Sequence, residues 1–274
     1  MSELAKRISV AVFGIPLLIG VTFLGGWYFF SIILIVSVVA QWEFYQIQKN
    51  KKIFPQSISG IVAGVIVLLG IQTGMWLNAG LILVLCLMII MANEMFRHQN
   101  NVSPNIGVTI LGIFYIPILL GSLLYIRIYI DKILPNTAVA GFKFILMIFA
   151  AIWICDTFAY GFGRKFGKHK LYEKVSPNKS LEGAIAGLIG SVLVVFLVKQ
   201  LEVLPLKWLH VLVFGASIGI VGQTGDLVES WFKRDAGVKD TSTLLPGHGG
   251  MLDRFDSIIF VSPVLLILAS ALFT

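Results

Sequence analysis

The stretch Trp27–Tyr45, WYFFSIILIVSVVAQWEFY, determines the class of fold. No charged residue falls between Tyr28 and Trp42, and aromatic residues stand at both ends of the run. About 20 apolar residues in an α-helix span the hydrocarbon core of a bilayer, and Trp and Tyr favour its two interfaces with water. The stretch therefore predicts a transmembrane helix.

Further apolar runs of similar length lie near 8–25, 57–73, 76–95, 106–126, 142–162, 183–200, 208–229 and 255–273. Together with the run near 27–46, they predict an all-α, polytopic integral membrane protein with about nine transmembrane helices. The run at 8–25 follows MSELAKR, but no small-residue cleavage site comes after it. We therefore expect an uncleaved first membrane helix and not a signal peptide.

The composition agrees with this class. Of the 274 residues, 57% are hydrophobic and 13% are charged, whereas soluble domains carry about 25% charged residues. Basic segments beside membrane helices explain the net charge of +7, so we expect no nucleic-acid partner. Cys86 and Cys155 lie in apolar runs and indicate neither a disulfide framework nor a zinc site. We expect a single membrane domain over 1–274, with N-terminal helices in 1–140 and the active site on the C-terminal helices in 141–274.

The basic residues predict the orientation. If the N-terminus is cytoplasmic, most Lys and Arg residues fall in cytoplasmic segments, above all in 164–179 and 233–254. The positive-inside rule then predicts a cytoplasmic N-terminus, an outer C-terminus and an odd number of spans. Both basic segments would face the cytoplasm from the cell inner membrane.

The most polar part of the chain is the segment 230–256, SWFKRDAGVKDTSTLLPGHGGMLDRFD. Its glycines at 247, 249 and 250 let peptide N–H groups converge on an anion. Residues three apart, such as Asp253 and Asp256, share one face of a helix. Basic residues, backbone donors and paired carboxylates together suit a metal-bound phosphate substrate. The alternative is a solvated loop whose charges serve only solubility.

The same segment carries a resemblance to a known family. The pattern is Ser230-x-Phe232-Lys233-Arg234, then Lys239-Asp240, then Leu245-Pro246-x-His248-Gly249-Gly250-Met251-x-Asp253-Arg254-Phe255-Asp256. It resembles the signature of the phosphatidate cytidylyltransferases (CDP-diglyceride synthetases), and every fixed position is filled. The resemblance implies a multi-helix membrane enzyme of phospholipid biosynthesis that makes CDP-diacylglycerol and pyrophosphate from CTP and phosphatidic acid.

Two more carboxylates, Asp156 and Asp226, fall inside apolar runs. An ionisable residue within a span is costly and by default suggests function, although a structural ion pair is the alternative. The predicted topology brings both to the cytoplasmic ends of their helices, where Asp253 and Asp256 also lie. Glu43 and Glu94 are near cytoplasmic helix ends too, but there we expect ordinary interfacial placement.

A second basic segment ends in SPNKSLEG at 176–183. It predicts a helix start, with Ser180 as the cap and Glu182 in the first turn. The family commonly has a Ser-Pro-Lys-Lys-Thr-x-Glu-Gly string here, which this segment resembles with Asn178 and Ser180 as departures. Asn178 removes one positive charge. The alternative is a loop that binds only anionic lipid headgroups.

The resemblance implies that the phosphate of phosphatidic acid attacks the α-phosphorus of CTP, with Lys233, Asp226 and Asp253 as catalytic residues. The expected ligands of Mg²⁺ are Asp226, Asp253, Asp256 and Asp156, and a second metal ion stays open. Substrate contacts are expected from Ser176, Lys179, Ser230, Arg234, Lys239, His248, Gly249, Gly250 and Arg254. His248 either contacts a phosphate or orders the glycine turn. Membrane lipid is an expected partner, and a homodimer stays open.

Two other classes of protein are alternatives. An ion-coupled transporter would place its carboxylates near the centres of the spans and show an inverted repeat. Here the acidic residues gather toward one end of the helices, and no repeat is visible. A structural membrane subunit would leave the composition of residues 230–256 unexplained.

Overall fold

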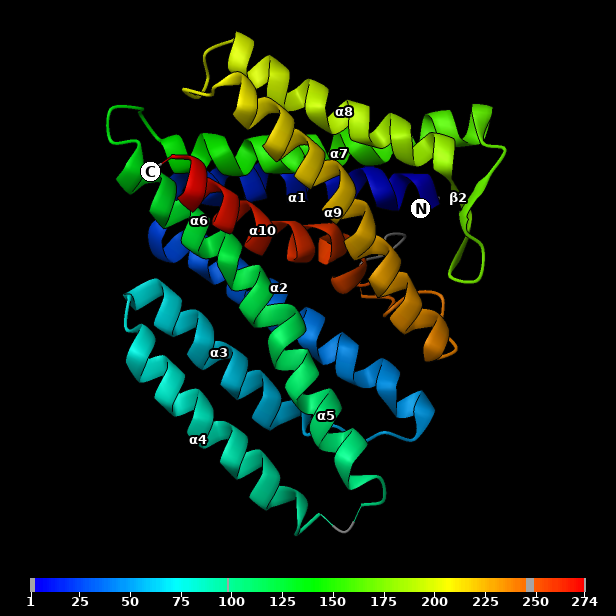
Figure 1. Cartoon of the computed structure of the whole chain (residues 1–274). Helices are drawn as coiled ribbons and strands as arrows, with labels where there is room; N and C mark the ends of the chain where they lie inside the picture. Colours follow the sequence, from blue (N-terminus) through cyan, green and yellow to red (C-terminus); the bar gives the residue numbers. More distant parts are fainter. Residues whose placement is uncertain (1–2, 98, 245–248, 274) are drawn as a thin grey trace. The chain divides into compact units, whose positions relative to one another are not determined.

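The computed structural model describes residues 3–97, 99–244 and 249–273 (Figure 1). These residues form long helices and one two-stranded hairpin. They divide into two compact units. The first unit takes in Met1–Tyr125 and Phe232–Phe255, and the second takes in Ile126–Trp231 and Asp256–Thr274. The expected single membrane domain, with a boundary at 140/141, stays a prediction.

The described residues confirm the all-α membrane class. The helices long and apolar enough to cross a membrane are Gly26–Lys51, Trp76–Glu94, Val102–Ile133, Ala140–Phe166, Leu181–Gln200, Trp208–Asp235 and Leu252–Leu272. Two shorter apolar helices cover Val12–Leu24 and Ser57–Thr73. Each apolar run found in the sequence falls on one of these segments. The number of crossings and the orientation of the termini stay predictions.

The first unit begins with α1 (Glu3–Leu24), α2 (Gly26–Gln48), the short turn η1 (Lys49–Lys51), α3 (Ser57–Thr73) and α4 (Trp76–Glu94). It continues with α5 (Val102–Ile113), which passes through a π-helical turn, η2 (Phe114–Ile118), into α6 (Leu119–Ile133). The part of α6 up to Tyr125 belongs to this unit, and the rest belongs to the second. Figure 1 shows α3 and α4 side by side. Pro117 lies in the π-turn, where the missing N–H of a proline interrupts the regular helical bonding.

The core of this unit is organised around Tyr45, which is fully buried. Its hydroxyl donates to the carbonyl oxygen of Thr109 at 2.8 Å and accepts from Gln41 Nε2 at 2.9 Å. A Cβ atom at Gly60 or at Gly112 would overlap the Tyr45 side chain. These two glycines therefore let α3 and α5 pack directly against α2.

The second unit contains α7 (Ala140–Phe166), β1 (Lys170–Tyr172), β2 (Ser176–Ser180) and α8 (Leu181–Gln200), and most of α9 (Trp208–Asp235) and α10 (Leu252–Leu272). Figure 1 shows α7 and α8 packed along their length, with the antiparallel hairpin at one end. Membrane helices pack closely where small residues meet. A Cβ at Gly187 would come within 2.9 Å of the Cys155 carbonyl oxygen, and one at Gly225 within 2.8 Å of the Asp256 carbonyl oxygen.

The hairpin was not predicted from the sequence. The predicted helix start is confirmed at Ser180, whose hydroxyl accepts a hydrogen bond from the Gly183 N–H at 3.1 Å. The preceding residues 176–180 form a strand instead. They include Pro177 and Asn178, residue types that are depleted in strands, and they lack an alternating apolar pattern.

Candidate active site

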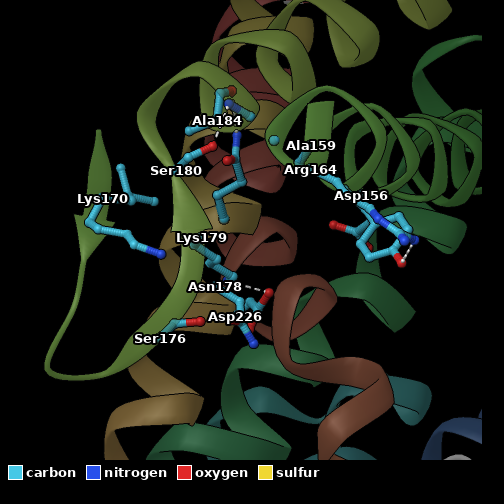
Figure 2. Close-up of a pocket in the computed structure, with 15 residues that line it drawn as sticks. Asp156, Ala159, Arg164, Lys170, Ser176, Asn178, Lys179, Ser180, Ala184 and Asp226 are labelled. Carbon is cyan, nitrogen blue, oxygen red and sulfur yellow. Dashed lines mark hydrogen bonds and ion pairs between the residues drawn. The ribbon is translucent and has the colours of Figure 1, made fainter. Parts of the chain in front are cut away.

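A pocket of about 620 Å³ opens in the second unit, between α7, the hairpin, α8 and α9 (Figure 2). Arg164, Lys170 and Lys179 line it with positive charge. The carboxylates of Asp156 and Asp226 line the same pocket, and much of the remaining lining is small or apolar. Charged groups of both signs on apolar helices suit a ligand that brings anionic groups and a cation together.

Glu182, in the first turn of α8, fixes the base of the hairpin. Its carboxylate accepts hydrogen bonds from the N–H groups of Lys168 at 3.1 Å and His169 at 3.3 Å, and lies 2.7 Å from His169 Nδ1. Ser180 is the last residue of β2 and caps α8, so the strand runs directly into the helix. The strand that carries Lys179 is therefore tied to α8 at its base.

Lys179 forms an ion pair with Asp226 of α9 (Figure 2). The two side chains are 28% and 33% exposed, so a ligand entering the pocket can reach the pair. Asp256 interacts electrostatically with Asp226, Asp156 and Lys179. Three of the four carboxylates singled out in the sequence are thus gathered in one unit, around a lysine. Ser230 Oγ lies 3.5 Å from Asp226 Oδ1, at the outer limit of a hydrogen bond.

The described residues contain no group of three or more His, Cys, Asp or Glu side chains arranged to hold a metal ion. The chemistry of the donors nevertheless fits a hard divalent cation, because Asp156, Asp226 and Asp256 offer only carboxylate oxygens. Asp226 already holds a cation, the ammonium group of Lys179. A divalent ion would have to take over that position.

The fourth carboxylate, Asp253, belongs to the first unit. It pairs with Lys233 Nζ at 2.8 Å, and the two side chains are only 6% and 11% exposed. It also accepts from the Gly250 N–H at 2.7 Å, the Thr241 N–H at 3.1 Å and the Thr241 hydroxyl at 3.0 Å. A carboxylate has about four lone-pair positions, so the acceptor capacity of Asp253 is already used.

The other residues expected at the site are placed as follows. Ser176 lines the pocket of the second unit. Arg234 Nη1 donates to the Val238 carbonyl oxygen at 3.1 Å, at the end of α9. Lys239 and Arg254 are exposed, and Gly249 has a φ of 80°, which favours glycine. His248 lies outside the described residues. The predicted roles of these residues stay predictions.

The expectation for Glu43 and Glu94 is wrong. Both are buried inside the first unit, with exposed fractions of 0% and 3%. Glu94 accepts from Asn105 Nδ2, Gln56 Nε2 and Arg97 Nη1 at 2.7 to 2.8 Å. Each glutamate is the sole acidic residue of its apolar run, and that isolation was the signal that could have drawn attention to them.

Comparison with known proteins identifies relatives along the whole chain. The model of the cytidylyltransferase family matches residues 5–272. A phosphatidate cytidylyltransferase of Staphylococcus haemolyticus is 34% identical over 265 residues, which cover 96% of this chain and 97% of the relative.

Two further relatives match over a shorter region. Phosphatidate cytidylyltransferases of Staphylococcus epidermidis and Staphylococcus aureus are 49% identical over 134 residues and 46% identical over 143 residues, respectively. In both cases the match covers 48% of this chain, and the chain spans about half the length of the relative (51%).

Proposed function

Because the chain belongs to the cytidylyltransferase family, we propose that it is a phosphatidate cytidylyltransferase. The reaction joins CTP and phosphatidic acid to give CDP-diacylglycerol and pyrophosphate. The observation that carries the proposal is the pocket of the second unit, in which an Asp–Lys ion pair and further basic groups lie between the hairpin and helices able to cross a membrane. Such a pocket suits a substrate with a phosphate headgroup and acyl chains.

The chemistry is a phosphoryl-group displacement. A phosphate oxygen of phosphatidic acid forms a bond to the α-phosphorus of CTP, and the bond from that phosphorus to the oxygen of the β-phosphate breaks. The attacking oxygen is already largely deprotonated near neutral pH, so no strong base is required. Positioning and charge neutralisation therefore supply most of the catalysis.

Basic side chains carry out the neutralisation in this proposal. Arg164, Lys170 and Lys179 surround the pocket of the second unit and offset the charge of phosphate groups bound there. Lys233, Arg234 and Lys239 of the first unit are proposed to contact the triphosphate of CTP.

We include Mg²⁺ in the proposal, with Asp226, Asp256 and Asp156 of the second unit as its ligands. A bound divalent ion would neutralise the phosphate oxygens on which charge develops. On this view, Lys179 holds Asp226 in place until substrate binds, and then becomes available to a phosphate oxygen. The role of Asp253 as a metal ligand stays a prediction.

The proposal is tested with purified protein, phosphatidic acid, Mg²⁺ and one of CTP, ATP, GTP or UTP at a time. We expect lipid-linked nucleotide and an equal amount of pyrophosphate with CTP, and at least tenfold less product with the other three. A protein that forms no lipid-linked nucleotide with any of them is not this enzyme. Cation flux through the same protein in vesicles would then favour the transporter.

We also propose that the site faces the cytoplasm of a bacterial inner membrane. The test uses single cysteines at Lys174, next to the hairpin strands, and at Asn136, in the loop before α7, both of which are exposed. In a background lacking Cys86 and Cys155, Lys174→Cys should react with an impermeant thiol reagent only from the cytoplasmic side. Asn136→Cys should react only from the outer side, and the reverse pattern would contradict the orientation.

A further inference from the structure

Glu43, near the C-terminal end of α2, is fully buried and contacts a segment about 200 positions away. Its Oε1 accepts from the Ser242 hydroxyl at 2.5 Å and from the Met251 N–H at 3.0 Å. Its Oε2 accepts from the Leu252 N–H at 2.8 Å and from the Thr241 hydroxyl at 3.2 Å. All these donors lie within residues 241–252, the polar segment before α10, and all belong to the first unit.

Two features fit the Glu43 carboxylate to this segment. Leu252 is the first residue of α10, so a negative charge at the Met251 and Leu252 N–H groups satisfies free donors at the positive end of the helix dipole. Gly250 provides the space: a Cβ there would overlap the Thr241 hydroxyl and approach the Glu43 oxygens to 2.7 and 2.8 Å. A larger residue at 250 would therefore push Glu43 out of place.

The Thr241 hydroxyl links Glu43 to Asp253. Its oxygen lies 3.2 Å from Glu43 Oε2 and 3.0 Å from Asp253 Oδ2. A hydroxyl has one proton to donate, so the two carboxylates share a single donor. Moving Glu43 therefore changes the hydrogen bonding of Asp253, and through Asp253 that of its partner Lys233.

Other contacts within the first unit hold α2 against the same part of the chain. The rings of Phe44 and Phe232 meet edge to face, with centroids 5.4 Å apart. Lys51, in η1 after α2, forms an ion pair with Asp235, and Asn50 donates to the Ala236 carbonyl oxygen at 3.4 Å. The end of α2 thus holds residues 232–236, 241–242 and 251–252 of the same unit.

We propose that Glu43 is a positioning residue of the active site. Its carboxylate holds residues 241–242 and 251–252 and, through the Thr241 hydroxyl, sets the orientation of Asp253 and Lys233. The inference rests on the proposed function for its catalytic consequence, but the holding of the segment does not depend on it. Glu43 itself touches no substrate in this proposal.

The test is Glu43→Gln, with Glu94→Gln as the matched control. Both changes remove a buried carboxylate of the first unit, but Glu94 accepts hydrogen bonds from residues 56, 97 and 105 and not from Thr241, Ser242, Met251 or Leu252. In Glu43→Gln the amide NH₂ faces a backbone N–H, which leaves a buried donor unpaired. We expect turnover at saturating CTP, per folded enzyme, to fall at least tenfold, while Glu94→Gln stays within twofold of wild type.

Hydrogen exchange gives a readout that does not need activity. The amides of Met251 and Leu252 should exchange at least tenfold faster in Glu43→Gln than in wild type, and at an unchanged rate in Glu94→Gln. If wild type makes no lipid-linked nucleotide, the proposed function fails, while this comparison still decides whether Glu43 holds the segment.

Thr241→Val carries the test if Glu43→Gln does not fold. Removing the hydroxyl should lower turnover at saturating CTP at least threefold. Where Glu43→Gln does fold, the double variant should lose no more than the less active single variant. Turnover of Glu43→Gln equal to that of Glu94→Gln, or unchanged exchange at Met251 and Leu252, would overturn the inference. Normal turnover of Thr241→Val would do the same.

Discussion

Asp253→Asn is expected to lower turnover at saturating CTP by at least about a hundredfold, on the order of 3 kcal/mol in the activation barrier. The Asp253 carboxylate accepts from Lys233 Nζ, from Thr241 and from the Gly250 N–H. An asparagine presents a donor on one side and carries no charge, so it cannot accept from all of them. Lys233 is only 11% exposed and would lose the carboxylate that pairs with it; breaking a buried ion pair costs roughly 3 kcal/mol in stability.

The measurement combines turnover per folded enzyme with the thermal unfolding midpoint in detergent. Asp235→Asn is the matched control, because it breaks the ion pair with Lys51 in the same unit, where Asp235 is 47% exposed. Exposed pairs contribute about 0–1 kcal/mol, so the control should keep nearly normal stability and turnover. If Asp253→Asn retains a tenth of wild-type turnover, Asp253 is not a catalytic residue.

Lys233→Gln tests the same ion pair from its other side. We expect a comparable loss of turnover that added anionic lipid does not restore, because in the proposal Lys233 contacts the substrate and not the lipid surface. If Lys233 and Asp253 act together as an ion pair, the turnover of the double variant should be no lower than that of the less active single variant. Losses that add would mean that the two residues act separately.

Asp226→Asn is the second change expected to abolish most activity, again by at least about a hundredfold in turnover. Its carboxylate is the partner of Lys179 and one of three that gather in the second unit. Asparagine keeps the size of the side chain but removes the charge that holds Lys179 and, in the proposal, the metal. The Mg²⁺ concentration for half-maximal activity should therefore rise as turnover falls.

The control for Asp226 is Asp131→Asn, which breaks another ion pair of the second unit. Asp131 pairs with Arg127 and accepts from the Gly141 N–H at 2.7 Å, next to the start of α7. It does not line the pocket that contains Asp226. We expect Asp131→Asn to lower the thermal unfolding midpoint and to leave the Mg²⁺ dependence of activity unchanged. Equal activity of the two variants would remove Asp226 from the site.

The membrane class and the helices could be predicted from the sequence because both depend on local properties. An apolar run near 20 residues satisfies its own backbone hydrogen bonds as a helix wherever it packs, and every predicted run is helical in the structure. The cap at Ser180 was predictable for the same reason, since its hydroxyl bonds an N–H three residues away. The motif at 230–256 could likewise be recognised as a linear pattern.

The pairing of polar groups was decided only by the tertiary structure. Lys179, in β2, forms an ion pair with Asp226, 47 positions later on α9, a partner that its own segment does not indicate. Glu43 was expected to be an ordinary interfacial residue, yet its buried carboxylate accepts hydrogen bonds from Thr241 and Leu252. Nothing local distinguishes a solvated carboxylate from a buried one. Which donors surround it depends on how separate helices pack, and here that packing is set by small residues such as Gly250, whose missing side chain leaves room for Glu43.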